Sequence, residues 1–488
     1  DSLSRVTAVR SDAHSIDYTY DFGVGASMGT LVSSTRRSVL NEGVSATRSY
    51  ERDLFGRVVR VDESVTHAAV GATASPIGES VMGLNDSRVN RFSYATSSGV
   101  MTASYEYELD FTKRLSVAAG GVTKTLWQAT ERDAWGNVET GQLGEWLDVS
   151  RSFYADTGRL RDSTIRGPSA AGGASVAWTE DAFFNTRGFL ERKDWTLSGV
   201  VGLSTVSESH AYRYDGVGRL TKEVFTDSTE LELTYDFIGN MRTRGSQVLT
   251  PDSSNPYRLA GATYDDAGRV TDIVDPIVGA LSLTGYTTED LPTVVTSSSG
   301  SSVEFEYGPT GARVLRREGG RTNHYFFDGT CEDKRSSGAL QESACTFFCE
   351  GEPVSTVDLT LAGQAEFHVV VADRLGSGVL IAKDTDDGVE VESYLEYSPW
   401  GEVRQSWGAR SPADPDSPVG FTGHREEVGS GMIDMRGRFY MPGCARFATP
   451  DPVVFNVFDA QAYQGYAYVR NNPHAYTDPS GFSHEVVV

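Results

Sequence analysis

Two Asp-Pro pairs near the end of the sequence carry the residues that could do chemistry. The first, Asp451 with Pro452, lies in "RFATPDP", and the second, Asp478 with Pro479, lies in "YTDPSGF". Because Asp-Pro-Ser-Gly is ordinary turn chemistry, two surface turns are one interpretation of these pairs. The other is a pair of carboxylates that hydrolyses the peptide bond just beyond them. In such a pair the charged carboxylate activates a water and the protonated one polarises the carbonyl.

The composition of the chain limits its partners. The 488 residues include 43 basic and 67 acidic side chains, which gives a net charge of −24. Phosphate binding needs a basic surface, so nucleic acid is not expected as the main partner. No run approaches the roughly 18 apolar residues of a membrane span. The sequence starts at Asp1 without a signal-like segment, so we expect a fragment or processed form of a secreted or cell-surface protein.

Metal and cofactor sites are not expected from the cysteines and histidines. No Cys-x-x-Cys pair occurs, and the eight histidines show no paired metal spacing. "DTDDG" at 384–388 is typical of an acidic turn rather than a calcium loop. Either one local disulfide in an oxidising compartment or free buried thiols would fit the four cysteines. Three of these are clustered and one stands apart: Cys331, Cys345, Cys349 and Cys444.

A short unit recurs along the first two thirds of the chain. It has an aromatic-containing strand, usually an Asp, a short turn, then Gly-Arg or Gly-Asn and a second strand, as in "YRYDGVGRLTKEV" and "LTYDFIGNMRTR". The turn glycines follow one another at 22, 30, 30, 21 and 29 residues: Gly136, Gly158, Gly188, Gly218, Gly239 and Gly268. Self-similarity of this kind predicts one repetitive β-architecture rather than separate domains.

The residue pattern of the unit predicts a β-hairpin. The glycine fits a turn position with positive φ, and the Asp can bind its own turn backbone. The flanking runs alternate apolar and polar residues, so each strand is half buried and successive hairpins must stack into one sheet. We expect the arginine after the glycine to be an exposed charge that contributes little to stability.

The hairpin units resemble YD repeats, also called RHS repeats, over roughly residues 15 to 330. The resemblance implies an all-β fold in which the hairpins form a strip of sheet that spirals into a hollow shell. A generic β-sandwich or propeller is the alternative.

The C-terminal part resembles the RHS-associated core that closes such shells. "DRLGS", "YSPWG", "FTGHREEVGSGMIDMRGRFYMPGCARFATPDP" and "YQGYAYVRNNPHAYTDPSGF" carry the likeness over more than a hundred residues. In that family the core is an intramolecular aspartic protease that releases a C-terminal toxin segment. The resemblance implies the domains 1–330 (repeat shell), 331–365 (Cys-containing connecting segment), 366–482 (core) and 483–488 (stub of the variable segment).

The family's catalytic pattern falls on three residues of this chain. Asp451 and Asp478 take the positions of the two catalytic aspartates, and Arg438 in "RFYMP" takes that of the supporting arginine. The implied scissile bond joins Phe482 to Ser483. Arg436 and Arg446 lie nearby as competing arginines.

Two departures from the family pattern bear on this assignment. Phe482 replaces the usual Leu, a mild change for an apolar pocket. The separation of 27 residues between Asp451 and Asp478 (478 minus 451) is longer than usual and puts the geometry of the pair in question. His474, between the two turns, is expected to be structural.

The resemblance implies a bacterial toxin-encapsulating shell, secreted or at the cell surface, that cleaves itself once. Its partners would be its own C-terminal toxin or cargo segment, further shell subunits and components of a secretion apparatus. The alternative is a non-proteolytic YD-repeat surface or adhesion protein. A carbohydrate-binding β-protein ranks lower, since only scattered Trp residues favour it.

Overall fold

The computed structural model consists almost entirely of antiparallel strands, each paired with its neighbours in the chain. The structure describes residues 5–10, 14–20, 30–38, 44–53, 57–67, 77–82, 88–408, 419–427, 429–454, 460–482 and 485–486. Within these ranges there is no α-helix, only short 3₁₀ turns, and hence no helix suited to crossing a membrane.

The described strands of the first half of the chain form a 20-stranded sheet, and the next 14 form a second sheet. The first sheet contains β1 (Ala8–Arg10), β2 (His14–Tyr20), β3 (Leu31–Ser38), β4 (Val44–Arg52), β5 (Val58–His67), β6 (Ile77–Met82), β7 (Val89–Thr96), β8 (Gly99–Glu108), β9 (Phe111–Ala119), β10 (Val122–Arg132), β11 (Val138–Leu143), β12 (Leu147–Phe153), β13 (Leu160–Gly167), β14 (Val176–Phe184), β15 (Leu190–Ser198), β16 (Val206–Tyr214), β17 (Leu220–Val224), β18 (Glu230–Tyr235), β19 (Met241–Arg244) and β20 (Gln247–Val248). The second contains β21 (Thr263–Tyr264), β22 (Val270–Asp275), β23 (Gly279–Thr284), β24 (Val294–Ser297), β25 (Ser302–Tyr307), β26 (Arg313–Glu318), β27 (Arg321–Phe326), β28 (Cys331–Ser336), β29 (Ala339–Cys349), β30 (Glu352–Thr360), β31 (Ala365–Ala372), β32 (Gly378–Asp384), β33 (Val389–Tyr397) and β34 (Val403–Gly408).

The remaining elements belong to residues 419–482, which we call the inner segment, and to the strand that follows it. They are η2 (Phe421–Gly423), β35 (Arg425–Glu427), β36 (Met432–Asp434), β37 (Phe439–Met441), η3 (Pro442–Cys444), β38 (Arg446–Phe447), η4 (Ala460–Tyr463), η5 (Val469–Asn471), β39 (Tyr476–Thr477) and β40 (Glu485–Val486). β35 to β38 form one small sheet, and β39 pairs with β40.

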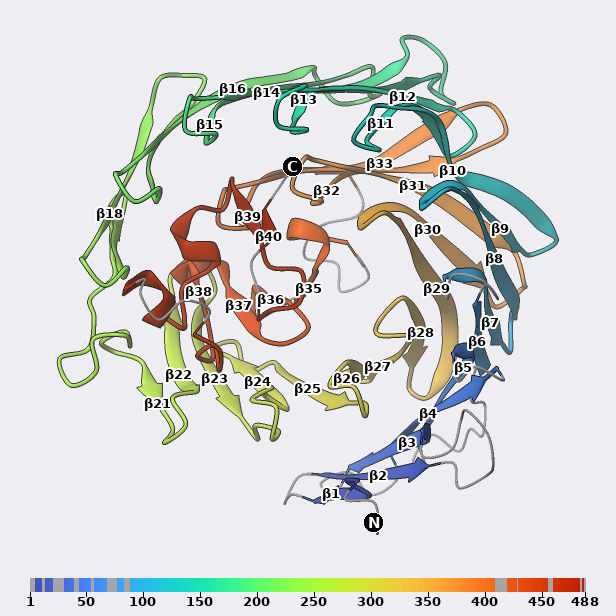
Figure 1. Ribbon diagram of the computed structural model, residues 1–488, viewed down its shortest axis with the longest axis horizontal. Helices are drawn as coiled ribbons and strands as arrows, with labels where there is room; N and C mark the ends of the chain where they lie inside the picture. The colour runs from blue at the N-terminus through green and yellow to red at the C-terminus, as the bar shows by residue number, and fades with distance from the viewer. Residues whose placement is uncertain are drawn as a thin grey trace.

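The strip of sheet curls into a spiral with the inner segment in its middle (Figure 1). Strands β30 to β33 lie inside the curve of β8 to β14 (Figure 1), and we call this double-walled region the overlap. One apolar cluster fills it, with Leu115 and Leu126 from the outer wall and Val357 and Leu380 from the inner wall. The predicted all-β spiral shell is therefore confirmed, and the sandwich and propeller alternatives are not needed.

The repeat turns have the predicted geometry. All six turn glycines have φ between 69° and 94°. In the turns that begin at Asp133, Asp215, Asp236 and Asp265, one carboxylate oxygen accepts the backbone N–H groups two and four residues on, at 2.9–3.1 Å. Each Asp thus closes its own turn, as the sequence indicates.

The expectation that the turn arginines are exposed is wrong. The Arg219 side chain is only 14% exposed, and its Nε donates to Asp215 Oδ2 at 2.7 Å. Its guanidinium lies 4.7 Å from the centroid of the Tyr235 ring in the next unit. Stacking the strands side by side places the arginine of one hairpin between its own Asp and the neighbouring aromatic ring, a contact that one unit read alone does not reveal.

The second sheet runs without a break across two of the predicted domain limits. β27 pairs with β28 around residue 330, and β30 pairs with β31 around residue 365. The limits of the four domains remain predictions. In the connecting segment Cys331 and Cys345 face each other across β28 and β29 as a disulfide, while Cys349 and Cys444 are free and buried. Both alternatives for the cysteines therefore occur.

Candidate functional site

The inner segment docks onto the inward side of the repeat turns by side-chain hydrogen bonds. Asn472 donates to the Gly218 carbonyl at 2.7 Å, Asn471 donates to the Gly239 carbonyl at 2.9 Å, and the Tyr466 hydroxyl donates to the Gly268 carbonyl at 2.6 Å. Three consecutive repeat units thus hold one irregular segment. Since an irregular chain lacks partners of its own for its backbone, such external bonds are what fix its position.

The three predicted catalytic residues come together at the ends of short strands in this segment. Arg438 directly precedes β37, Asp451 lies in the loop after β38, and Asp478 directly follows β39. Nη2 of Arg438 is 3.0 Å from Oδ2 of Asp451 and 3.4 Å from Oδ2 of Asp478. The two carboxylate oxygens are therefore no farther apart than the sum of these distances. The long separation in sequence does not keep the carboxylates apart.

Arg438 also holds the chain just before the predicted scissile bond. Its Nε donates to the Gly481 carbonyl, and its Nη1 donates to the Gly465 carbonyl at 2.9 Å. The same Gly465 carbonyl accepts the backbone N–H of Asp451 at 2.8 Å. One planar guanidinium thus uses its fork of donors to hold both carboxylates, the Asp451 loop and the chain before the predicted scissile bond.

The charges at this site are largely removed from water. Arg438 and Asp478 are both 3% exposed, and the side chain of Asp451 is 18% exposed. Burial lowers the pKa of Arg438, and the neighbouring carboxylates of Asp451 and Asp478 act in the opposite direction. A guanidinium keeps its proton under these conditions. It therefore places a fixed positive charge between two carboxylates that would otherwise repel each other.

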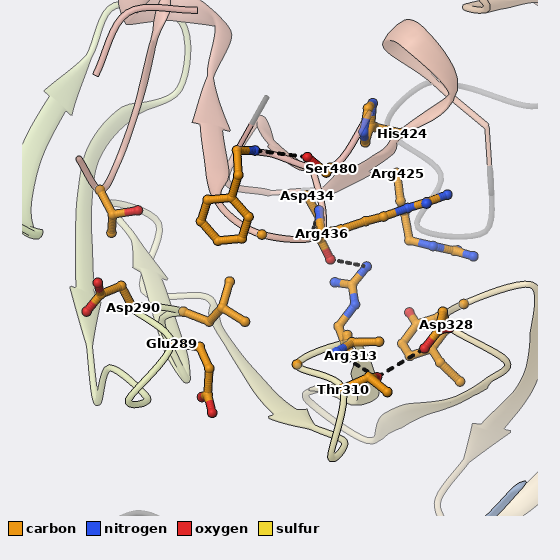
Figure 2. Close-up of a pocket in the computed structure, with 18 of the residues that line it drawn as sticks. Glu289, Asp290, Thr310, Arg313, Asp328, His424, Arg425, Asp434, Arg436 and Ser480 are labelled. Atoms are coloured by element: carbon orange, nitrogen blue, oxygen red, sulfur yellow. Dashed lines mark hydrogen bonds and ion pairs between the residues drawn. The ribbon is translucent and has the colours of Figure 1, made fainter. Parts of the chain in front are cut away.

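Phe482 lines two cavities. One, of about 240 Å³, is also lined by Arg438, Asp451 and Asp478. The other, of about 640 Å³, lies between the inner segment and the wall. Figure 2 shows Arg313 reaching from the wall towards Asp434, with Arg436 and Ser480 beside the same space. The smaller cavity has room for water beside both carboxylates.

The other residues considered from the sequence have structural surroundings. The guanidinium of Arg446 is buried and donates to the Tyr257 carbonyl at 2.5 Å, whereas Arg436 is exposed. His474 packs against the Tyr212 ring with the ring centroids 4.0 Å apart, and burial holds its pKa well below the usual value. Ser483, the residue after the predicted bond, lies outside the described residues.

Some contacts at the site could not be found from sequence. Gly465 contacts Arg438 and Gly437 contacts Ser480 through their backbones, which leaves no signature in residue type. Among the described residues no group of three or more His, Cys, Asp or Glu side chains could hold a metal ion. "DTDDG" instead begins at the end of β32, where Asp384 pairs with Lys124 of β10 at 3.0 Å.

Comparison with curated proteins finds relatives among bacterial toxins. No family model matches the chain. The chain is 24% identical over 281 residues to the tRNA nuclease WapA of Bacillus subtilis, covering 55% of this chain and 12% of that protein. It is 24% identical to toxin protein Tse5 of Pseudomonas aeruginosa and to the probable deoxyribonuclease RhsB of Dickeya dadantii, covering 79% and 76% of this chain and 25% and 28% of theirs. Salivary gland surface protein 1 of Aedes aegypti is 21% identical over 271 residues, covering 53% of this chain and 7% of that protein.

Solved structures share the fold over nearly the whole chain. A chain of the TcdB2-TccC3 crystal structure superposes with a TM-score of 0.73 at 14% identity, covering 96% of this chain and 27% of that one. A chain of the Photorhabdus luminescens Tc holotoxin pore gives a TM-score of 0.64 at 13% identity, covering 97% of this chain and 26% of that one. This chain thus spans between 7% and 28% of the length of the curated relatives named above. The comparisons support the RHS-repeat polymorphic toxin family that the repeats and the C-terminal motifs indicate.

Proposed function

We propose, from this kinship with RHS-repeat toxins, that the chain forms shell wall around a C-terminal cargo segment and severs itself from that segment after Phe482. The observation that carries the proposal is the position of Arg438, whose guanidinium contacts Asp451, Asp478 and the Gly481 carbonyl together. A buried arginine between two carboxylates could have a purely structural role. An arginine that also binds the carbonyl of Gly481, one residue before Phe482, is better explained by a role in catalysis.

The proposed reaction is hydrolysis of the Phe482–Ser483 peptide bond by the aspartate pair. A water attacks the carbonyl carbon of Phe482 while one carboxylate takes a proton from it, and the other, protonated, carboxyl donates to the carbonyl oxygen. The C–N bond then breaks, and the amine of Ser483 takes a proton as it leaves a carboxylate on Phe482. Arg438 keeps the two carboxylates together and stabilises the negative charge that develops on the oxygen.

The arrangement of the chain around the bond favours a reaction within one molecule. The Ser480 carbonyl accepts the backbone N–H of Gly437, and beyond the bond β40 pairs with β39. In that pair Glu485 lies opposite Thr477, the residue before Asp478. A tethered substrate has a high effective concentration, so a site with modest chemistry still completes one turnover. The cargo and further shell subunits or secretion components are the proposed partners, and the cell surface or exterior is the proposed location.

The experiment is a fusion in which a foreign domain follows Val488. The wild-type fusion should separate into two fragments on a denaturing gel, at a rate that does not depend on protein concentration. Asp451→Asn and Asp478→Asn should each leave the fusion whole, because Asn keeps the shape and loses the acid–base function. Asp266→Asn, in an exposed repeat turn, is the matched control and should cut normally. A wild-type fusion that stays whole would favour the non-proteolytic surface protein instead.

A further inference from the structure

The strand to be cut lies directly against the turn that carries Arg438. The backbone N–H of Gly437 donates to the Ser480 carbonyl at 3.0 Å, and Nε of Arg438 donates to the Gly481 carbonyl. The Phe482 N–H donates to the Ser480 hydroxyl at 3.3 Å. The backbone carbonyls of residues 480 and 481 are therefore held by two consecutive residues, 437 and 438.

Two glycines make this close approach possible. A Cβ atom on Gly437 would lie 2.2 Å from Cε2 of Phe482 and 2.6 Å from the Ser480 oxygen. A Cβ atom on Gly481 would lie 2.5 Å from the Met435 oxygen and 2.8 Å from the Arg438 nitrogen. Side-chain atoms do not approach so closely, so a larger residue at either position would push the two chains apart.

The Phe482 ring also has open space beside it. Phe482 is 40% exposed and borders the cavity of about 640 Å³. The space for residue 482 is thus limited next to the Cα of Gly437 and open towards the cavity, which Gly437, Arg436 and Ser480 also line (Figure 2).

We propose that Gly437 is a specificity-determining residue of the self-cleavage, forming the seat for a chain that has Gly at 481 and an apolar side chain at 482. This inference rests on the proposed function, since a seat for the strand matters only if the strand is cut. The seat sets the distance between the Phe482 carbonyl and Arg438, and with it the alignment of the bond with Asp451 and Asp478. We expect cleavage to require glycine at position 437 and to tolerate apolar side chains of different size at position 482.

The first test is the cleavage rate of the same fusion with Gly437→Ala. We expect cleavage to slow by about a hundredfold, the loss that a shift of about 1 Å at a reacting group can produce. Gly216→Ala is the matched control, because no atom lies within 4 Å of its added Cβ. Neither glycine has a positive φ, so the substitutions do not differ in backbone strain. Equal thermal unfolding of the two variants shows that the loss does not come from unfolding.

The second test varies the residue that occupies the seat. Phe482→Trp should cut within about threefold of wild type, because the larger ring extends into the open cavity. In a double-mutant cycle, Gly437→Ala should cost less in a Phe482→Ala background, where one of its two clashes is gone. If the two positions acted independently, the fold-changes in rate of the two single variants would multiply in the double variant.

The outcomes separate this inference from the function beneath it. An uncut wild-type fusion contradicts the proposed function. A cut wild type together with a Gly437→Ala variant of equal rate contradicts the seat alone, as would a folded Phe482→Trp variant that is not cut.

Discussion

The overlap and the inner segment are packed in different ways. In the overlap two walls of regular strands meet through mostly aliphatic side chains, with polar links such as the ion pair of Lys124 with Asp384 at 3.0 Å. The inner segment fills the other side of the spiral with large aromatic and Met side chains: Phe421, Met432, Met435, Phe439, Tyr440, Met441, Phe447 and Tyr468. Regular strands need only a matching apolar face, whereas an irregular segment needs bulky side chains to fill uneven space.

The inner segment also combines backbone strain with a buried ion pair to the wall. Among the described residues, six non-glycine residues of the inner segment have positive φ: Thr422, Arg436, Ala445, Val469, Arg470 and Asn471. Glu427 is buried between Arg313 and Arg316, the second at 2.9 Å. Strained conformations and buried ion pairs persist where surrounding structure enforces them, and they gather at functional sites. The contrast indicates that the overlap supplies stability and the inner segment supplies geometry.

We expect the largest effect from a substitution that breaks the ion pairs between the wall and the inner segment. Glu427→Gln leaves Arg313 and Arg316 buried without their main charge partner, so unfolding in denaturant should show a loss of about 4 kcal/mol. Cleavage of the fusion should also slow, because Arg313 contacts Asp434 in the strand leading to Arg438. The control is Glu304→Gln, which breaks a half-exposed pair with Arg317 and should cost less than about 1 kcal/mol. Equal losses in the two variants would contradict the account.

The next effect belongs to the overlap alone. Leu126→Ala, at a position 1% exposed, should lower the free energy of unfolding by about 3 kcal/mol through lost burial and a cavity. The molecules that remain folded should still cut their fusion at the wild-type rate. Val122→Ala, on the exposed part of the same strand, is the control. A slowed cleavage in folded Leu126→Ala protein would show that the two regions are not separable.

A pH effect should appear in the inner segment. Burial raises the pKa of Glu426 to about 7, against the opposing bond from Tyr397. An acid with a raised folded-state pKa adds no penalty below pH 4.5, where both states are protonated, and destabilises the fold as the pH rises towards 7. Glu426→Gln should therefore raise the free energy of unfolding by on the order of 2 kcal/mol at pH 8 and by almost nothing at pH 4, measured by denaturant unfolding. An equal increase at pH 8 and pH 4 would contradict this prediction.

The smallest expected difference concerns the repeat turns. Gly218→Val should cost about 3 kcal/mol, because its φ of 94° resists a β-branched residue and its Cβ would meet the Phe189 ring at 2.9 Å. Arg219→Ala should cost about 2 kcal/mol, through the lost bond to Asp215 and the lost contact with Tyr235. Thermal melts of both variants beside Arg161→Ala, an exposed arginine, measure this. An equal melting temperature for Arg219→Ala and Arg161→Ala would support the expectation from sequence that Arg219 is an exposed charge of little importance for stability.

The overall fold could be predicted because it depends on a short, repeated sequence pattern. Each Asp closes its own turn and each glycine takes its positive φ, so the hairpin is fixed by residues four positions apart. The place of Arg219 could not be predicted in the same way, because its ring partner Tyr235 belongs to the next hairpin.

The candidate site divides along the same line. Arg438, Asp451 and Asp478 could be named because their motifs resemble a known pattern. Gly437 and Gly465 could not, because they act through backbone atoms brought together only by the folded inner segment. Glu427 has its partners more than a hundred residues away, on the wall.

The most direct test of the central claim is the intact mass, under denaturing conditions, of wild-type chain extended beyond Val488, beside its Asp451→Asn variant. The account predicts that the wild type gives a fragment ending at Phe482 and a second fragment beginning at Ser483, while the variant gives one uncut mass. Denaturation is needed because both fragments can stay together inside the shell. A wild type with only the uncut mass, or an Asp451→Asn variant cut at the same bond, would contradict the account.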